Sequence, residues 1–593
     1  MLIYSLVSRL HKLLFTNRNK PSKNQVIFWF SLSMTVSVVF ALLALEKAFA
    51  AEYIVQDDAR QHVFWMLRYI DPNLFPNDLI ADYFQSVAPA GYSNLYRIFS
   101  LLGINPLFFN KLLPLIIGLF VTGYCFGVSL QIIPLPFTAF LTTLMLNQNL
   151  WIKDDLISGT QRIFTTPLLL AFLYYLSRKS LLPSLAGILL LGLFYPQYVF
   201  ICAGILILRL WDWSGDRFGF SQQKHDYLFC AMGLGVAFLV MLPYAVKTSE
   251  FAPVITVAQA KQLPEFWSGG RANFFLNNLL NYFLGGRSGM FGSSVVPVTL
   301  TTGFLLPFLM LFPAKFPLLK KIQREIVILP QMLIASVGMF FLAHILLFRL
   351  HLPSRYTGHS FRIILAISAA IFFTAIIDAI LSNFKPRTNP SVSTYLQQFI
   401  GLSFAAFIGI SLLFYYPVFL KHFPKTGYIN GQIPALYEFF QKQPKDILIA
   451  SIANETNNLP TFSQRSILIG REYAIPYHFG YYSKFRQRVI DLTKAQYSEN
   501  LEDVKTFIQK YGVDFWLLES KAFTSEYINK NSLLKQYYKS NLNQDKLVQI
   551  TKDISQNLEQ GKVPVLSKTI PNCTVAKMKN FVVLDTKCIL AKN

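Results

Sequence analysis

The sequence predicts an α-helical polytopic membrane protein with about eleven transmembrane helices and a C-terminal extracytoplasmic α/β domain. Of the 593 residues, 53% are hydrophobic and 14% are charged, whereas soluble domains usually contain about a quarter charged residues. The basic residues, which give a net charge of +23, lie in short clusters between long apolar runs, as topology signals do in membrane proteins. This pattern explains the charge without a nucleic-acid partner.

Apolar runs of about 15 to 25 residues have the length that crosses a bilayer core. With the basic N-terminus (Arg9, Lys12, Arg18, Lys20, Lys23) in the cytoplasm, the positive-inside rule predicts which later loops are basic. The loops at 178–179, 217–224, 315–324 and 385–387 agree with it. We therefore expect a multi-pass protein of the plasma (inner) membrane with a cytoplasmic N-terminus. The runs at 163–177 and 182–196 are short. If one of them is a re-entrant segment, the orientation of all later spans and of the C-terminal domain is reversed. The runs begin near Ile27, Leu112, Ile132, Ile163, Leu182, Tyr198, Leu228, Val295, Ile326, Phe361 and Phe399.

Residues 1–420 are expected to form the transmembrane domain, with a large first outward loop at 52–108, and residues 421–593 a separate α/β domain outside the cytoplasm. Strand-like runs at 446–452, 513–518 and 581–590 alternate there with helical patterns such as 500–511. Cys573 and Cys588 lie in this domain, and we predict that they form a disulfide because an oxidising compartment permits the bond.

The first outward loop begins with an acidic pair, Asp57 and Asp58, followed by Arg60 and His62. Adjacent carboxylates at a membrane surface can activate an acceptor as a general base or hold a divalent metal against a phosphate. We predict catalytic or metal-binding roles for the acids and substrate-binding roles for Arg60 and His62. The alternative is that the acids only complement the dipole of a helix over 59–69. Asp78, further along the loop, is expected to cap a helix.

A second acidic pair, Asp154 and Asp155, precedes Arg162 at the start of the fourth apolar run. An arginine at the start of a span needs a partner, either a carboxylate or a ligand phosphate. We predict that all three residues bind substrate and that the two acids are candidate metal ligands. The alternative, to which we give equal weight, is an ordinary salt bridge from Arg162 to Asp154 or Asp155 that fixes the start of the helix.

A third cluster, between the ninth and tenth runs, contains Arg355, His359 and Arg362. The positive-inside rule argues against placing such a basic group outside the cytoplasm for orientation alone. A lipid-linked phosphate would suit these donors, because the guanidinium fork matches phosphate oxygens, and anionic lipid headgroups are the alternative partner. Two Gly-Gly-Arg strings at 269–271 and 285–287 are too frequent in loops to support a prediction.

An acidic first outward loop, a second acidic outward loop, about eleven spans and a C-terminal outward domain together resemble the GT-C superfamily of membrane glycosyltransferases. Oligosaccharyltransferase catalytic subunits, protein mannosyltransferases and aminoarabinose transferases belong to it. The strings at 158–167 and 352–356 are also similar to bacterial membrane proteins of this kind. The resemblance implies that Asp57 or Asp58 is a base or metal ligand and that Asp154, Asp155 and Arg162 hold metal and donor phosphate. The domain lacks a Trp-Trp-Asp signature, which disfavours protein N-glycosylation.

The resemblance also implies the reaction: transfer of a sugar from a polyprenyl-phosphate donor to an extracytoplasmic acceptor, with inversion at the anomeric carbon. The expected partners are the lipid-linked donor and membrane lipids, and a divalent metal is a possible cofactor. A transporter or flippase for a lipid-linked or anionic solute is the main alternative, although the runs carry little charge in their middles. A polysaccharide polymerase or ligase and a non-catalytic membrane scaffold are two others.

Overall fold

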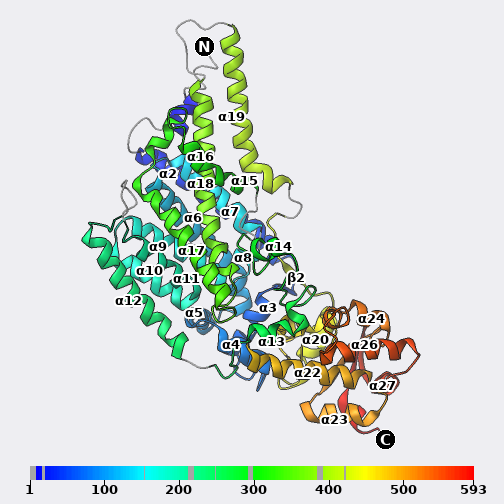
Figure 1. Cartoon of the computed structure of the whole chain (residues 1–593). Helices are drawn as coiled ribbons and strands as arrows, with labels where there is room; N and C mark the ends of the chain where they lie inside the picture. Colours follow the sequence, from blue (N-terminus) through cyan, green and yellow to red (C-terminus); the bar gives the residue numbers. More distant parts are fainter. Residues whose placement is uncertain are drawn as a thin grey trace.

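The fold comes from a computed structural model that describes residues 9–15, 21–152, 154–211, 219–246, 249–291, 298–383, 392–419 and 423–592 (Figure 1). The side chain of Asp154 is not described. Among the residues that the topology prediction used, Arg18, Lys20, Arg217, Lys385 and Arg387 lie outside the described residues, as does the predicted domain boundary at 420.

Helical segments correspond to all of the predicted apolar runs, and among the described residues five helices are long and apolar enough to cross a membrane. These are α2 (Lys23–Ala48), α6 (Pro106–Ile132), α12 (Lys224–Val246), α17 (Ile328–Ile345, continuing the turn η6 Arg324–Val327) and α18 (Ser354–Asn383). The other segments are α7 (Pro136–Trp151), α9 (Thr165–Ser177), α10 (Leu181–Phe194), α11 (Gln197–Leu208), α15 to α16 (Val298–Thr301, η4 Thr302–Leu305, Leu306–Met310) and α19 (Val392–Phe419).

The centre of the bundle is formed by α7 and α18, which pack against each other. Every residue of α7 is buried, and two thirds of the apolar window of α18 is buried. Their neighbours α2, α6 and α17 surround them. A helix that is apolar on all sides and covered by other helices has no lipid-facing surface, so α7 needs no membrane-spanning length of its own.

The predicted first outward loop, residues 52–108, folds into short elements at one end of the bundle: β1 (Ile54–Gln56), α3 (Ala59–His62), η1 (Phe64–Tyr69), α4 (Leu79–Val87) and α5 (Ala90–Leu101). The helix predicted over 59–69 is therefore divided, because Val63 has a φ of −117° between its two parts. The side chain of Asp78 accepts hydrogen bonds from the amides of Ile80 and Ala81 at 2.8 and 2.9 Å, which confirms its capping role.

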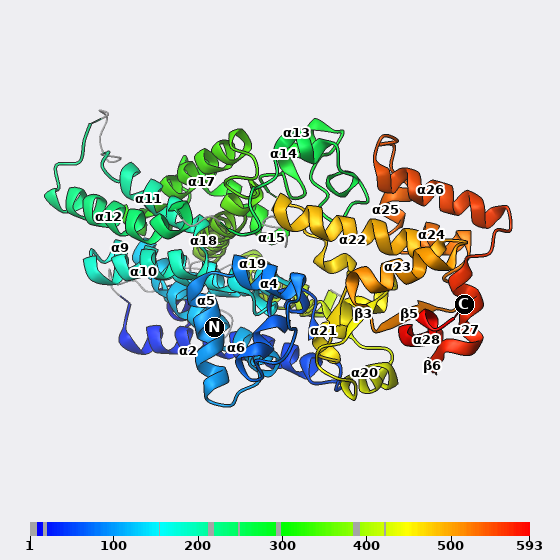
Figure 2. The same ribbon diagram turned by 90° about the horizontal axis from the view of Figure 1, so that it is seen from below.

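The first outward loop is joined to the C-terminal part of the chain. Strand β1 pairs antiparallel with β2 (Tyr428–Asn430), so that Ile54 lies opposite Asn430. Arg60 also donates a hydrogen bond to Asn458 at 2.8 Å. Helix α13 (Val257–Lys261) lies beside α22 (Phe479–Tyr497) in Figures 1 and 2, and η3 (Pro264–Phe266) contacts α22 through Glu265 and Arg486, while α14 (Leu279–Leu284) follows further along the same segment. Loops far apart in sequence thus lie at the same end of the bundle.

The C-terminal part is the predicted small α/β domain, with a five-stranded sheet of order β4-β3-β5-β7-β6. Strand β3 is parallel to β4 and β5, and β7 is antiparallel to β5 and β6. The strands are β3 (Leu448–Ala450), β4 (Ser466–Ile467), β5 (Phe515–Glu519), β6 (Thr574–Met578) and β7 (Phe581–Asp585). The helices are α20 (Pro434–Gln441), η7 (Asn454–Asn458), α21 (Leu459–Phe462), η8 (Arg471–Tyr473), α22 (Phe479–Tyr497), α23 (Leu501–Tyr511), α24 (Ser525–Lys530), α25 (Lys535–Tyr538), α26 (Lys546–Glu559), α27 (Val565–Cys573) and α28 (Thr586–Leu590).

The predicted disulfide is confirmed: Cys573 and Cys588 are bonded, with 5.5 Å between their Cα atoms. The strand predicted over 581–590 is only half correct, since β7 ends at Asp585 and α28 follows. The Asp585 side chain accepts a hydrogen bond from the amide of Lys587 at 2.9 Å. An acidic N-cap of this kind starts a helix even where the following residues are as apolar as the strand before them.

A buried carboxylate ties the outward segment at 249–291 to the C-terminal domain. Glu265, in η3, is completely buried and accepts hydrogen bonds from the hydroxyls of Tyr482 and Tyr537. Its other contact is an ion pair with Arg486 at 3.3 Å. Since Tyr482 and Arg486 lie in α22 and Tyr537 in α25, one side chain holds two helices of the domain against η3.

We expect Glu265→Ala to destabilise the protein by about 1–3 kcal/mol, because it leaves two buried tyrosine hydroxyls without their acceptor, while the half-buried Arg486 keeps its ion pair with Asp545. Thermal unfolding of the purified protein measures this. The control is Glu502→Ala, which removes a carboxylate that is 72% exposed and pairs with Lys505 one turn away. The control should change stability by about 0.5 kcal/mol or less. Equal losses in both variants would contradict the role of Glu265.

Candidate functional site

The backbone around the first acidic pair is fixed by the strand before it. After β1, the amide of Asp57 donates to the carbonyl of Gly427 at 3.1 Å. The side-chain oxygen of Gln56 accepts from the amides of Asp58 and Ala59 at 2.8 and 3.3 Å. Gln56 is completely buried, so this turn is a rigid platform that presents both carboxylates.

The two carboxylates have different partners. Asp58 is at the N-cap position of α3, but its side chain makes no capping hydrogen bond and instead forms an ion pair with Arg162, more than a hundred residues away. Asp57 pairs with Arg60, one turn along α3, and its side chain is 43% exposed. The helix-dipole alternative therefore does not describe Asp58, because its carboxylate makes a long-range contact rather than a cap.

The turn that carries Arg162 depends on a glycine. Gly159 has a φ of +61°, and a Cβ atom at this position would lie 2.0 Å from the side-chain nitrogen of Asn110. Asn110 donates to the carbonyl of Ser158 at 3.0 Å, and the hydroxyl of Tyr96 donates to the carbonyl of Gly159 at 2.7 Å. These contacts hold η2 (Gln161–Phe164), and with it Arg162, against α5 and α6.

Asp155, in α8 (Asp154–Ile157), joins the second and third predicted clusters. It lies 3.5 Å from Arg162 and forms a shorter ion pair with Arg362 of α18. Burial raises the pKa of the Asp155 carboxyl, but the positive charges of Arg362 and Arg355 outweigh burial and hold it well below its usual range. Asp155 is therefore an ionised carboxylate between arginines. The alternative prediction, a salt bridge to Arg162, is present, and it is one part of a wider network of ion pairs.

Arg355 and the histidines lie within electrostatic reach of this network. Burial first, and then the positive charges of Arg355, Arg287 and Arg162, lower the pKa of His351 to about 3. Three arginines from separate segments thus act on one imidazole. His359 is buried, with a ring nitrogen 3.1 Å from the Thr166 hydroxyl. Its contact ties α18 to α9, and its substrate-binding role remains a prediction.

The sequence prediction missed part of the cluster. Arg271 forms an ion pair with Glu472 of η8 at 2.8 Å, and Gln61 donates to the same carboxylate at 3.1 Å. Arg287 donates to the hydroxyl of Tyr477 at 3.3 Å. The two Gly-Gly-Arg strings were the available signal. In the first of them, a Cβ atom on Gly270 would lie 2.3 Å from the backbone of Glu265, so glycine is required for the turn that places Arg271.

The described carboxylates do not form a ready metal site. No group of three His, Cys, Asp or Glu side chains among the described residues is arranged to hold a metal ion. Asp57, Asp58 and Asp155 each have an arginine partner instead, and Asp154 falls outside the described side chains. The metal-binding roles of Asp57, Asp58, Asp154 and Asp155 remain predictions.

Known structures with a similar architecture are membrane glycosyltransferases. The oligosaccharyltransferase of Archaeoglobus fulgidus in the apo form has a TM-score of 0.52 and 10% sequence identity, covering 84% of this chain and 71% of that chain. Archaeal oligosaccharyltransferase AglB from the same organism, in complex with an inhibitory peptide and a dolichol-phosphate, has a TM-score of 0.49 and 11% identity over 88% of this chain and 72% of that chain. Arabinofuranosyltransferase AftD from Mycobacteria has a TM-score of 0.46 and 11% identity over 85% of this chain and 35% of that chain.

No protein-family model matches the chain, and no curated protein matches it in sequence. The similarity to the apo oligosaccharyltransferase, at 10% identity, concerns the fold. It shows that this chain shares the fold of that oligosaccharyltransferase. The chemistry of this chain has to be argued from its own residues.

His62 provides a test of the electrostatics of the site. Burial, with the positive charges of Arg355 and Arg271, lowers the pKa of His62 to about 4. The unfolded chain, with a pKa of about 6.5, takes up a proton first as the pH falls. The contribution of His62 to stability is therefore complete above about pH 6.5 and declines as the pH falls to about 4.

We expect His62→Gln to reduce the loss of stability between pH 7 and pH 4.5 relative to the wild type, measured as the midpoint of thermal unfolding at each pH. The exposed His225 serves as the control, and His225→Gln should retain the pH dependence of the wild type. An unchanged pH dependence in His62→Gln would contradict the lowered pKa of this imidazole.

Proposed function

We propose that this protein is a membrane glycosyltransferase that moves a sugar from a polyprenyl-phosphate donor to an acceptor outside the cytoplasm. One observation carries the proposal: carboxylates and arginines from the first outward loop, the 154–162 loop and the start of α18 meet at one end of an apolar helical bundle. The similarity to the GT-C fold supports it. The Asp57–Arg60 pair lies in the same loop as Asp58.

The arginines fit the donor phosphate. The cluster contains Arg162, Arg271, Arg287, Arg355 and Arg362 and fewer described carboxylates. Guanidinium groups recognise phosphate oxygens through paired hydrogen bonds, and in a partly buried site they stabilise the charge that develops on a leaving phosphate. The position at the ends of the apolar helices lets the lipid tail of the donor stay in the bilayer while its phosphate reaches the cluster.

In the proposed reaction the acceptor oxygen attacks the anomeric carbon from the face opposite the phosphate. The proton of the acceptor passes to the carboxylate of Asp57, the bond between the anomeric carbon and the phosphate oxygen breaks, and the polyprenyl phosphate leaves with the bonding electrons. We assign the base to Asp57 because its side chain is 43% exposed, against 22% for Asp58. Asp58 is assigned to position Arg162 for the phosphate.

The proposed topology places this cluster and the C-terminal domain outside the cytoplasm, with eleven crossings of the inner membrane. Supporting this assignment, the N-terminal segment meets the far end of α18, where the ring of His11 lies 3.0 Å from Asp378. The start of α18 lies at the charged cluster. The His11–Asp378 contact lies at a helix end, whereas transporters place their ionisable residues near the midplane of the membrane.

We expect Asp57→Asn to lower the rate of sugar transfer by about 10²–10⁴-fold with little effect on donor binding, as the loss of a general base does. Asp58→Asn should weaken donor binding as well, because Arg162 loses a partner that orients it. A matched pair of assays, transfer from a radiolabelled polyprenyl-phosphate sugar and equilibrium binding of that donor, separates the two roles. Identical effects of the two variants on both measurements would contradict this division of labour.

Arg355→Ala is expected to weaken donor binding by about tenfold and to reduce turnover, since a charge-assisted hydrogen bond to phosphate is lost. Lys320→Ala, which removes an exposed basic residue at a distant loop, is the control and should leave both unchanged. Donor binding that is unaffected by Arg355→Ala would assign Arg355 to anchoring lipid headgroups instead.

The orientation is tested by labelling introduced cysteines in intact cells with a membrane-impermeant maleimide. We expect Glu502→Cys, in α23 of the C-terminal domain, to react from outside and Lys320→Cys to react only after permeabilisation. Both native residues are exposed, so the side of the membrane on which each lies, and not its burial, decides whether the introduced cysteine reacts. The reverse labelling pattern would place the charged cluster in the cytoplasm.

A further inference from the structure

The C-terminal domain places an arginine beside the first acidic pair. Arg471 is the first residue of η8, and the next two residues of that turn contact α3. The side chain of Gln61 donates to Glu472 at 3.1 Å, and the hydroxyl of Tyr473 donates to the carbonyl of Arg60 at 3.2 Å. Since α3 directly follows the acidic pair, Arg471 lies next to this pair on the side of the domain.

The positive charge of Arg471 is only partly matched by carboxylates. Its ion pair with Glu472 is 3.8 Å long, and Arg271 contacts the same carboxylate more closely, at 2.8 Å. Asp57, which is paired with Arg60, also acts on Arg471 electrostatically. The three arginines thus share two carboxylates, which leaves one positive charge in excess.

Burial makes this excess charge costly. The side chain of Arg471 is 27% exposed, and its Nε atom is buried and forms no hydrogen bond with the described residues. Burial lowers the pKa of the Arg471 guanidinium most, and the positive charge of Arg271 lowers it as well, while Glu472 and Asp57 raise it too little to restore its usual value. Glu265 is already held by another arginine and two tyrosine hydroxyls. A bound anion would supply the charge that Arg471 lacks.

The two residues of the acidic pair contact different parts of the molecule. Asp58 pairs with Arg162 of the bundle, where we propose that the donor phosphate binds. Asp57 contacts the domain side, because its partner Arg60 donates to Asn458 of η7 at 2.8 Å. In the proposed reaction the acceptor oxygen approaches from the face opposite the phosphate, so the acceptor enters from the side of the domain.

We propose that the acceptor carries an anionic group, a carboxylate or a phosphate, and that Arg471 binds this group while Asp57 takes the proton of the attacking oxygen. This inference rests on the proposed function, because it uses Asp57 as the base. The terminal amino groups of a guanidinium match the oxygens of either anion through paired hydrogen bonds. Arg471 thereby selects acidic acceptors over neutral ones, and Glu472 holds the turn that carries it against α3.

The test uses the full chain in detergent micelles, with polyprenyl phosphate at saturation to occupy the donor site. The midpoint of thermal unfolding is measured during titration with three probes that share one sugar ring: methyl glucuronide, which carries a carboxylate, methyl glucoside 6-phosphate, and neutral methyl glucoside. At constant ionic strength we expect saturable stabilisation by an anionic probe and none by the neutral probe. The more strongly stabilising probe identifies carboxylate or phosphate as the group. Equal responses to all three probes, or no response to either anionic probe, would overturn the proposal.

Variants assign the response to Arg471. Arg471→Gln is expected to weaken the apparent affinity for the anionic probe by about tenfold, the loss of one charge-assisted contact. Arg471→Lys keeps the charge but loses the fork, so it should weaken the affinity several-fold, and it carries the test if Arg471→Gln does not fold. An affinity that is unchanged in both variants would overturn the proposal.

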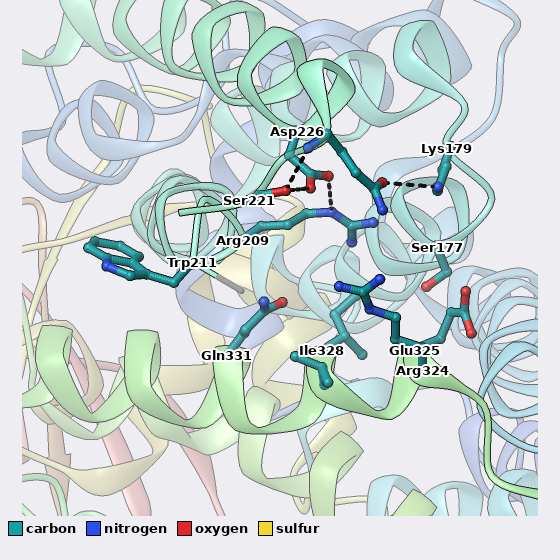
Figure 3. A pocket seen from close by; sticks show the side chains of 12 residues that line it. Ser177, Lys179, Arg209, Trp211, Ser221, Asp226, Arg324, Glu325, Ile328 and Gln331 are labelled. Carbon is teal, nitrogen blue, oxygen red and sulfur yellow. Dashed lines mark hydrogen bonds and ion pairs between the residues drawn. The ribbon is translucent and has the colours of Figure 1, made fainter. Parts of the chain in front are cut away.

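The matched control is Arg209→Gln, which should bind the probe as the wild type does. Arg209 is 22% exposed and pairs with Asp226 at 3.0 Å (Figure 3). It lines a polar cavity at the ends of α9 and α11 that lie away from the charged cluster.

Binding of polyprenyl phosphate separates this proposal from the proposed function. Arg471→Gln should bind polyprenyl phosphate as tightly as the wild type does. Failure of the wild type to bind polyprenyl phosphate would contradict the proposed function, and with it the acceptor role of Arg471. Normal binding of polyprenyl phosphate without a response to the anionic probes would overturn the acceptor role alone.

Discussion

The chain of ion pairs from Asp58 through Arg162 and Asp155 to Arg362 is the constraint on which the arrangement of this protein depends. It links the first outward loop, the 154–162 loop and α18, which are separated by up to three hundred residues. Charges at the end of an apolar bundle are costly without partners, so each of these segments can lie there only if the others do. The helices of the bundle are thereby held in register at this end.

The C-terminal domain completes the same end of the molecule. Strand β2 pairs with β1, directly before the acidic pair, and Glu472 of the domain pairs with Arg271. Conversely, Glu265 of the loop segment contacts Arg486 and two tyrosines of the domain. Because both the domain and these loops contribute side chains to the contacts, the two parts form one interface. Movement of the domain would therefore change the surroundings of Asp57 and Arg60.

Much of this could be predicted from the sequence, for a physical reason. Apolar runs of membrane-spanning length become helices because backbone groups in a bilayer must bond to one another, and clustered charges at the ends of those runs mark the site. Glu472 could not be predicted, because it reaches the cluster only through the packing of the C-terminal domain on the loops, and the Gly-Gly-Arg strings that contain Arg271 and Arg287 are too common to single them out. For the same reason the sequence could not distinguish α7, which is wholly covered by protein, from a helix that faces lipid.

Under the proposed function, the sharing of carboxylates lets one cluster be both stable and able to bind the donor phosphate. Asp155 interacts with two arginines, and Arg162 interacts with two carboxylates. A guanidinium has five N–H donors, whereas a carboxylate has two oxygens, so shared ion pairs orient the arginines without using all of their capacity. A phosphate entering such a site meets donors that are already in place, and less reorganisation is needed when charge develops on the leaving oxygen. Fewer carboxylates would leave the arginines to repel one another, and more would neutralise the site before the donor arrived.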